Sequence, residues 1–378
     1  MLRSIAAACA LAVLPGPAGL CAAQDNPDLD RPVLDGVDTV VREAMEAGHF
    51  PGAAVGVTRH GEAVHVGSYG LASIEHDAPV RRDTVFELAS LTKHMTALLI
   101  MELAEEGALS TDDRVTEYLD RARPEWESIT IDDLLAHMGG LAHRFEPRPY
   151  DEFLLEYSTD LMLDGALDTE MQAEPGEDWI YSDQGYFLLG LVIENVTGRP
   201  FDAVLEERWF GPLGMNVTGR LDQHAIIPRR AEGYAWKDGE IVRNRRVWQF
   251  GQMAHFGVVS SLDDMLAWEA ELAAPSVTSP QAFLDTTDIR RAFDAGESCE
   301  AWGYAAGWMT FEFGGRQIVA HGGYSGTAYL RDLTTGLSVV VLTNREDAEG
   351  ALSPVDIAWA VANAADPALP ETGPRCWE

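Results

Sequence analysis

The chain has 378 residues and a formal net charge of −34 at pH 7, and 46% of its residues are hydrophobic. This composition is typical of a globular protein, and the length suggests about two domains or one large bilobed domain. A surface this acidic repels nucleic acid and anionic lipid, so we expect no nucleic-acid partner. Beyond the N-terminal segment, no apolar stretch reaches the roughly 18 residues of a membrane-spanning helix, so we expect no integral membrane segment.

Residues 1–23 are predicted to be an export signal. Arg3 supplies the positive charge, residues 5–14 form an apolar run too short to span a bilayer, and small residues follow up to Ala23. We therefore expect cleavage near Ala23, a mature chain of 24–378, and a periplasmic or secreted location.

The cysteines carry two further predictions. Cys21 would be the attachment point if the chain were a lipoprotein, but the bulky Leu20 precedes it where a small residue is expected. Removal of the signal leaves Cys299 and Cys376, which we expect to pair in an oxidising compartment. The alternative is two free thiols that lie too far apart to bond.

The apolar pattern and the turn residues predict the secondary structure in chain order. In the first third we expect a helix over 33–47, a hairpin over 53–66 that turns at Gly61, and a helix from Phe86 to about Glu106. The segment from Asp112 to about Arg208 has a mostly helical pattern, with short helices over 131–137 and 186–197. Short strands are expected over 304–311, 317–320, 327–333 and 337–343, followed by a last helix over 354–364.

This order of elements indicates an α+β fold. One hairpin at the start and a meander at the end favour a single antiparallel sheet formed from both chain ends, about 24–111 and 245–378. Residues 112–244 would then be an inserted, mostly helical lobe. A cleft between the sheet and this lobe is the expected place for a functional site.

Ser90 and Lys93 are the first candidates for catalysis. The chain contains two lysines against 25 arginines, and one of the two follows Ser90 by three residues in the expected buried helix. On a helix this spacing puts both side chains on one face, where the N-terminal N–H groups favour negative charge. Burial lowers the pKa of a lysine, so a neutral Lys93 can take the Ser90 proton and start acyl transfer. The alternative is an N-cap serine beside a lysine whose stem packs and whose head reaches solvent.

Two later segments carry further candidate residues. Tyr181-Ser182-Asp183 precedes an expected helix and can place a phenol in a cleft; alternatively, its polar residues cap the helix and its tyrosine packs. His321-Gly322-Gly323 ends an expected strand, where the glycines let a ligand approach the backbone and the histidine points into the same space. The alternative is a glycine-rich turn with a surface histidine.

Together, the three segments resemble the motifs of the serine β-lactamase and penicillin-binding-protein superfamily, in particular the class C β-lactamase-like serine hydrolases. That family carries Ser-x-x-Lys, Tyr-x-Asn, and Lys-Thr-Gly or His-x-Gly, which here read Ser90-Leu91-Thr92-Lys93, Tyr181-Ser182-Asp183 and His321-Gly322-Gly323. Landmarks such as "DLLAHMGGL" and "FGVVSSLDDMLAW" occur in the family's order, so the resemblance extends over about 33–365. It implies a β-lactamase/transpeptidase-like fold and one hydrolase domain over 24–378.

The resemblance also implies a role for each matching residue. Ser90 is the nucleophile that becomes acylated, and Lys93 and Tyr181 share the work of the general base. His321 stands where the family often has lysine, and it would position the substrate or tune Tyr181. The backbone N–H groups of Ser90 and Tyr324 would form the oxyanion hole. The resemblance implies a small acyl compound as substrate, and no metal or cofactor.

Asp183 departs from the family pattern, which has asparagine there. An asparagine amide can donate to a substrate amide and accept from the lysine, whereas an ionised aspartate only accepts. The anion also favours the charged form of Lys93 and leaves a substrate amide carbonyl without its donor. The departure therefore disfavours β-lactams and peptides and favours esters, unless Asp183 is protonated.

The sequence thus predicts an exported serine hydrolase that acts on carboxylic esters or small acyl compounds. Its substrate is expected to lie against Asp183, His321, Gly323 and Tyr324. A β-lactamase, DD-carboxypeptidase or D-aminopeptidase with the same nucleophile is the rival within the family, and a catalytically lapsed binding protein of the same fold is the rival outside it. The oligomeric state is left open.

Overall fold

The structure is a computed structural model, and it describes residues 34–143, 157–244, 254–294, 299–346, 352–370 and 373. The expected export signal and Cys376 lie outside these residues. Cys299 is half-buried beside the sheet and is disulfide-bonded. Because Cys376 lies outside the described residues, the pairing of these two cysteines stays a prediction. Within the described residues, no helix combines the length and the apolar character needed to cross a bilayer.

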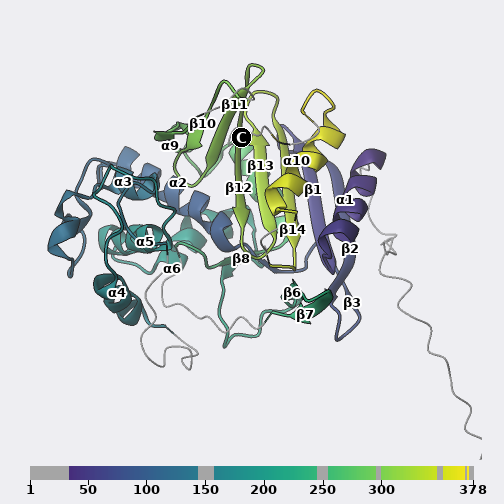
Figure 1. Ribbon diagram of the computed structural model, residues 1–378, viewed down its shortest axis with the longest axis horizontal. Helices are drawn as coiled ribbons and strands as arrows, with labels where there is room; N and C mark the ends of the chain where they lie inside the picture. The colour runs from purple at the N-terminus through teal and green to yellow at the C-terminus, as the bar shows by residue number, and fades with distance from the viewer. Residues whose placement is uncertain are drawn as a thin grey trace, which may run out of the picture.

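A nine-stranded antiparallel sheet forms the centre of the fold (Figure 1). Its order is β3-β2-β1-β14-β13-β12-β11-β10-β9, so the two ends of the chain meet where β1 pairs with β14. The strands are β1 (Gly52–Arg59), β2 (Glu62–Ser73), β3 (Ala78–Pro79), β9 (Arg291–Ala292), β10 (Ala301–Tyr304), β11 (Met309–Phe313), β12 (Arg316–Gly323), β13 (Thr327–Asp332) and β14 (Leu337–Thr343). The prediction of one antiparallel sheet built from both chain ends is confirmed.

The pairing at the centre of this sheet follows from the sequence. Strands β1 and β14 are buried along almost their whole length, as their continuous apolar runs require of strands covered on both faces. The first hairpin turns at His60 and Gly61, both with positive φ, which is the two-residue turn that matches the twist of paired strands.

Helices cover both faces of the sheet. On one face, α1 (Asp35–Gly48) and α10 (Pro354–Ala365) pack against each other and over the strands, and Figure 1 shows α10 in front of β13 and β14. On the other face lie α2 (Thr92–Glu105) and α8 (Leu262–Ala273), whose apolar side chains join the larger of the two main cores.

The remaining helices extend this second face to one side of the molecule (Figure 1). They are α3 (Ile131–Leu135), α4 (Thr159–Asp168), α5 (Asp183–Thr197), α6 (Phe201–Leu205), α7 (Gly211–Leu213) and α9 (Pro280–Thr287). The chain also has short strands outside the main sheet: β4 (Phe86–Glu87), β5 (Gly219–Arg220) and β8 (Val258–Ser260) form one small sheet, and β6 (Tyr234–Lys237) pairs with β7 (Glu240–Arg243) near β3, away from these helices (Figure 1). The predicted helical segment 112–244 therefore also contains β5, β6 and β7.

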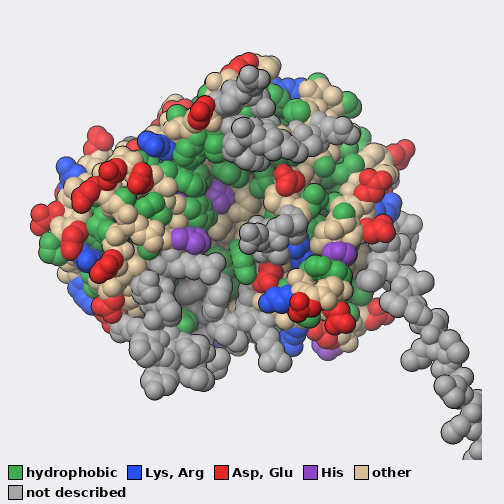
Figure 2. Space-filling model, viewed as in Figure 1, with side chains coloured by type: hydrophobic (Ala, Val, Ile, Leu, Met, Phe, Trp, Pro, Cys, Tyr) green, Lys and Arg blue, Asp and Glu red, His purple; other side chains and the backbone are tan. Residues whose placement is uncertain are grey.

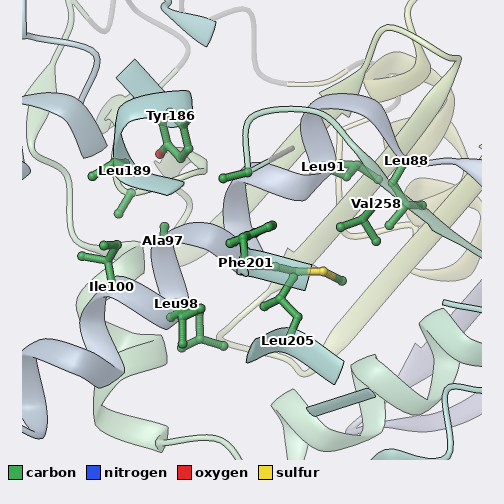
Figure 3. Close-up of a cluster of buried hydrophobic side chains, with 14 of the residues drawn as sticks. Leu88, Leu91, Ala97, Leu98, Ile100, Tyr186, Leu189, Phe201, Leu205 and Val258 are labelled. Atoms are coloured by element: carbon green, nitrogen blue, oxygen red, sulfur yellow. The ribbon is translucent and has the colours of Figure 1, made fainter. Parts of the chain in front are cut away.

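Helix α2 runs through the interior of the protein. Twelve of its 14 residues are buried, so it has no polar face to turn toward water. Figure 3 shows Ala97, Leu98 and Ile100 of α2 surrounded by side chains of its neighbours, among them Leu189 from α5 and Leu205 from α6. The prediction of a buried helix after Ser90 is confirmed.

The start of this helix differs from the prediction. Phe86 and Glu87 form β4, which pairs with β8, and Ala89–Leu91 form a 3₁₀ turn before α2 begins at Thr92. Ser90 therefore lies in the 3₁₀ turn that leads into α2, and not in the α-helix itself.

The strand predicted over 304–311 is also wrong. It is two strands, β10 and β11, joined by a turn at Gly307. Gly307 has a φ of 74°, and a Cβ there would lie 2.7 Å from the carbonyl oxygen of Lys93. The glycine lets this turn lie directly against the first residues of α2.

Candidate active site

Ser90 is presented by a strained turn. Ala89, immediately before it, is fully buried and has a φ of 50°, in the left-handed region that costs roughly 1–2 kcal/mol for a residue with a Cβ. The turn is fixed by its surroundings, since the N–H of Leu88 donates to the carbonyl of Val258 in β8. Strain of this kind is concentrated at functional sites, where the surrounding structure holds a residue in place.

The Lys93 ammonium lies buried beneath Ser90. It donates to Ser90 Oγ at 3.3 Å, to Asp183 Oδ1 at 2.6 Å and to the carbonyl of His255 at 2.7 Å, and its side chain has no exposed surface. These contacts use all three donors of an ammonium. They join α2 to the first residue of α5 and to the segment before β8, so one side chain holds three parts of the site together.

The charge state of Lys93 corrects the sequence-based expectation. Burial acts to lower its pKa, but the Asp183 carboxylate and Tyr181 outweigh burial and raise the pKa above the ordinary value. Burial acts to raise the pKa of Asp183, and the neighbouring Lys93 reverses this, so the pKa of Asp183 is lowered. Lys93 and Asp183 therefore form an ion pair in the resting site, and the prediction that burial makes Lys93 neutral is wrong.

Tyr181 lies over the same ammonium. Its ring centroid is 4.8 Å from Lys93 Nζ, and its phenol interacts with Lys93 and Ser90. Burial raises the pKa of Tyr181 despite the nearby cation, so the phenol is protonated at rest. Ser90, Lys93 and Tyr181, which the sequence predicted as the catalytic residues, are thus brought together.

The loop that carries Tyr181 is fixed by its neighbours. Ser182 Oγ accepts from the N–H of Gly185 and caps α5, while the N–H of Ser182 donates to His137 Nδ1. His137 is buried and its ring lies 4.4 Å from that of Tyr181. Both interpretations of the segment hold at once: Ser182 is the helix cap, and Tyr181 faces the nucleophile.

His321 is buried at the end of β12 and faces Tyr181, with ring centroids 6.1 Å apart. Burial, with the nearby Lys93 charge, lowers the pKa of His321 to about 4, so the ring is neutral. Its Nδ1 contacts the carbonyl of Gly322 at 2.7 Å, and a carbonyl only accepts, so Nδ1 carries the proton. Nε2 then accepts from the hydroxyl of Tyr304 at 3.1 Å.

The end of β12 is pressed against the nucleophile turn. A Cβ on Gly323 would lie 2.4 Å from the carbonyl oxygen of Leu88 and 3.3 Å from the Ala89 Cβ. Two residues later, Ser325 Oγ donates to the carbonyl of Glu87. Tyr324 lies between these two contacts in the chain, and its part in an oxyanion hole stays a prediction. The backbone before Ser90 approaches Gly323 closely, and the approach of a ligand to these glycines stays a prediction.

The hollow between the sheet and the helices is visible from outside. Figure 2 shows histidine side chains in the middle of the molecule, with hydrophobic side chains around them, between two acidic outer parts. The side chain of Asp183 keeps 19% of its exposure where Lys93 keeps none, so solvent reaches the carboxylate but not the ammonium.

A family comparison agrees with this arrangement. The family model described as beta-lactamase matches residues 37–363, which is most of the chain. The chain belongs to the beta-lactamase family. It therefore has the beta-lactamase/transpeptidase-like fold of a family of serine hydrolases, as the sequence motifs predicted.

Individual proteins that this chain is similar to share about a quarter of its sequence over the matched residues. Protein flp of Staphylococcus aureus is 26% identical over 279 residues, which are 72% of this chain and 55% of that protein, so the chain spans about half the length of this curated relative. An octameric penicillin-binding protein homologue from Pyrococcus abyssi has a TM-score of 0.75 at 26% identity, covering 89% of this chain and 77% of that one. EstCE1, a hydrolase with promiscuous acyltransferase activity, has a TM-score of 0.72 at 23% identity, covering 87% and 97%.

Three contributions to the site were missed by sequence analysis. The carbonyl of His255 holds Lys93, His137 supports the Tyr181 loop, and Tyr304 holds His321. His137 stands in "DLLAHMGGL", and His255 directly precedes "FGVVSSLDDMLAW", so both were within reach of the family landmarks. Tyr304 carried no such signal, because it was taken for the first residue of a strand over 304–311, whereas it is the last residue of β10.

Replacement of Gly323 by alanine tests the contact between β12 and the nucleophile turn. The new Cβ would collide with the backbone at Leu88, so we expect a loss of stability of about 1–3 kcal/mol and a displaced Ser90. The rate at which Ser90 reacts with an acylating reagent should fall at least about tenfold. Gly322→Ala is the control, because its Cβ would meet only the flexible Val355 side chain at 3.1 Å. If Ser90 reacts with the reagent at the same rate in both variants and in the wild type, the contact at Gly323 does not position Ser90.

Tyr304→Phe tests whether Tyr304 positions His321. Without the hydroxyl, Nε2 of His321 has no donor and is free to take a proton, so its pKa should rise from about 4. The expected result is an acid limb of kcat/KM that moves to higher pH, measured together with the His321 resonances by NMR. Tyr118→Phe, which removes a hydrogen bond to Asp113 outside the site, should leave the acid limb in place. An unshifted limb in Tyr304→Phe would refute the role.

Proposed function

We propose that the protein is an exported serine hydrolase that cleaves carboxylic esters through an acyl-enzyme on Ser90. The observation that carries this proposal is the buried Lys93 ammonium, which contacts both Ser90 Oγ and Asp183 and lies over the ring of Tyr181. Export rests on the expected signal at residues 1–23 and is tested by the N-terminal sequence of the mature protein.

The proposed reaction has two halves. The Tyr181 and Lys93 pair first releases one proton to solvent, because both groups are protonated at rest. Ser90 Oγ then attacks the ester carbonyl while its proton passes to the deprotonated pair, and the oxyanion is held by the N–H groups of Ser90 and Tyr324. The pair returns this proton to the alkoxy oxygen as the bond from carbonyl carbon to that oxygen breaks. In the second half a water molecule attacks the acyl carbon and gives its proton to the pair, which passes a proton to Ser90 Oγ as the carboxylic acid leaves.

The ion pair favours esters over amides. Both candidate bases are protonated at rest, since the pKa of Lys93 and that of Tyr181 are raised. A base that must first lose a proton works best on a substrate whose leaving group needs little assistance, and an alkoxide leaves more readily than an amine anion. Asp183 is ionised and only accepts, so it also offers no donor to a substrate amide carbonyl.

A second candidate is the cleavage of an amide, as in a β-lactamase or a D-aminopeptidase. The observation in its favour is the similarity to the penicillin-binding protein homologue from Pyrococcus abyssi. A binding protein that has lost catalysis is the third candidate, and the retained contact between Lys93 and Ser90 speaks against it.

Labelling with a fluorophosphonate tests the nucleophile. We expect one covalent adduct on the mature wild-type protein, measured as an increase in intact mass, because Lys93 and Tyr181 lie in contact with Ser90 Oγ. Ser90→Ala should gain no mass under the same conditions. An unlabelled wild-type protein would sink the catalytic proposal and favour the binding protein.

Asp183→Asn tests the basis of ester preference. Asp183 raises the pKa of Lys93 against the effect of burial, so removal of the carboxylate should lower that pKa. Asp183 also raises the pKa of Tyr181, which should therefore fall as well. The fraction of deprotonated base at a given pH then increases, so the rise of kcat/KM with increasing pH should occur at lower pH than in the wild type. Ester hydrolysis near neutral pH should be unchanged or faster.

The same variant separates the two enzymatic candidates. Hydrolysis of a D-amino-acid amide or a β-lactam should appear or rise, because asparagine can donate to the amide carbonyl. Asp183→Glu, which keeps the charge, is the control and should retain the wild-type direction of preference. A large loss of ester hydrolysis in Asp183→Asn would contradict the proposed role of the anion.

A further inference from the structure

Three aromatic side chains extend outward from the catalytic tyrosine. Trp179, Phe293 and Trp302 come from the loop before α5, the end of β9 and strand β10, and each is half-buried. We call them the aromatic stripe. Trp302 also packs against the core on the α1 and α10 face and stacks on Phe311, so it anchors the outer end of the stripe. None of the three has a part in the chemistry proposed above, and half-exposed rings next to a nucleophile are typical of a ligand surface.

The rings of the stripe are in continuous contact. Trp179 meets Tyr181 at 6.4 Å between centroids, Phe293 stands edge-on to Trp179 at 5.2 Å, and Trp302 lies 4.5 Å from Phe293. The backbone fixes the outer pair, since the N–H of Phe293 donates to the carbonyl of Trp302. These separations are those of favourable aromatic pairs, so the stripe is a preformed surface.

The electrostatics beside the stripe do not suit an anionic substrate. The Lys93 charge is matched by Asp183, and His321 is neutral, because burial lowers its pKa to about 4. Among the described residues, no arginine contacts Ser90, Tyr181, Asp183 or His321. The net charge of −34 also repels an anionic substrate from the protein as a whole. A neutral, apolar group fits this surface and a carboxylate does not.

The position of the stripe indicates which end of the substrate it contacts. Tyr181 belongs to the pair that returns a proton to the leaving group, and the stripe begins beside Tyr181 at Trp179. The proposed oxyanion hole uses the N–H of Tyr324, which follows Gly323 where β12 meets the nucleophile turn. A group that follows the stripe therefore continues from the leaving oxygen and not from the acyl carbon.

We infer that the aromatic stripe binds the apolar, preferably aromatic, alcohol portion of a neutral ester. This inference rests on the proposed ester hydrolysis and specifies its substrate class. An aromatic alcohol can pack against Trp179 and Phe293 while the ester carbonyl lies at Ser90. A small acyl group then suffices on the other side.

The test compares two acetate esters, ethyl acetate and benzyl acetate, by pH-stat. The wild-type protein should show a higher kcat/KM for benzyl acetate, and Phe293→Ala should lower the ratio of the two values about tenfold while leaving ethyl acetate unchanged. Phe293→Leu keeps apolar volume and should lose less. Ile74→Ala removes an exposed apolar side chain elsewhere and should leave the ratio as in the wild type. An unchanged ratio in both Phe293 variants would overturn the inference.

A binding measurement separates this inference from the proposed function. In Ser90→Ala, which cannot be acylated, benzyl acetate should bind with a dissociation constant that Phe293→Ala raises at least about fivefold, followed by tryptophan fluorescence. Binding without hydrolysis by the wild type would sink the esterase proposal and leave the stripe in place. If the wild type hydrolyses both esters and Phe293→Ala leaves the dissociation constant of benzyl acetate unchanged, the role of the stripe is refuted and the esterase proposal stands.

Discussion

The buried ammonium of Lys93 is the constraint on which the rest of the site depends. An unpaired charge in the protein interior is very costly, so the fold must bring it an anion and further acceptors. Asp183 supplies the anion from the start of α5, His255 supplies a carbonyl before β8, and Ser90 supplies its hydroxyl. Because these groups come from three parts of the chain, folding around Lys93 also sets the distance between nucleophile and proton carriers. The ion pair is thus as much a structural device as a catalytic one.

The same ion pair sets the electrostatic character of the hollow. Burial and the Lys93 charge favour neutral histidines around Tyr181: they keep the pKa of His321 at about 4 and that of His137 well below the ordinary value. Tyr304 completes this arrangement by donating to the one nitrogen of His321 that is free to accept. The surroundings of the nucleophile carry little net charge, although the protein as a whole is strongly acidic. This electrostatic balance is the basis of the proposal that the substrate is neutral.

The sequence predicted most of the fold because its signals are local. Alternating or continuous apolar runs located the strands of the sheet, and the buried helix after Ser90 followed from its lack of a polar face. The predictions failed where a distant contact decides the conformation. Gly307 turns the chain against α2, Ala89 is held at positive φ by its neighbours, and the pKa of Lys93 is set by a residue 90 positions away. The family motifs located Ser90, Lys93 and Tyr181, but no local pattern revealed Tyr304.

Catalysis and substrate selection draw on differently built parts of the molecule. The nucleophile turn is clamped by backbone contacts at Gly323 and Ser325, which leave little freedom for Ser90. The stripe, in contrast, lies at β9 and β10, the last strands of the sheet, where the side chains are only half-buried. Substitution at a sheet edge disturbs fewer packed neighbours than substitution at its centre. Under the proposed role of the stripe, substitutions there would change substrate preference while the ion pair and the turn before Ser90 stay as they are, and one fold can support hydrolases of different specificity in this way.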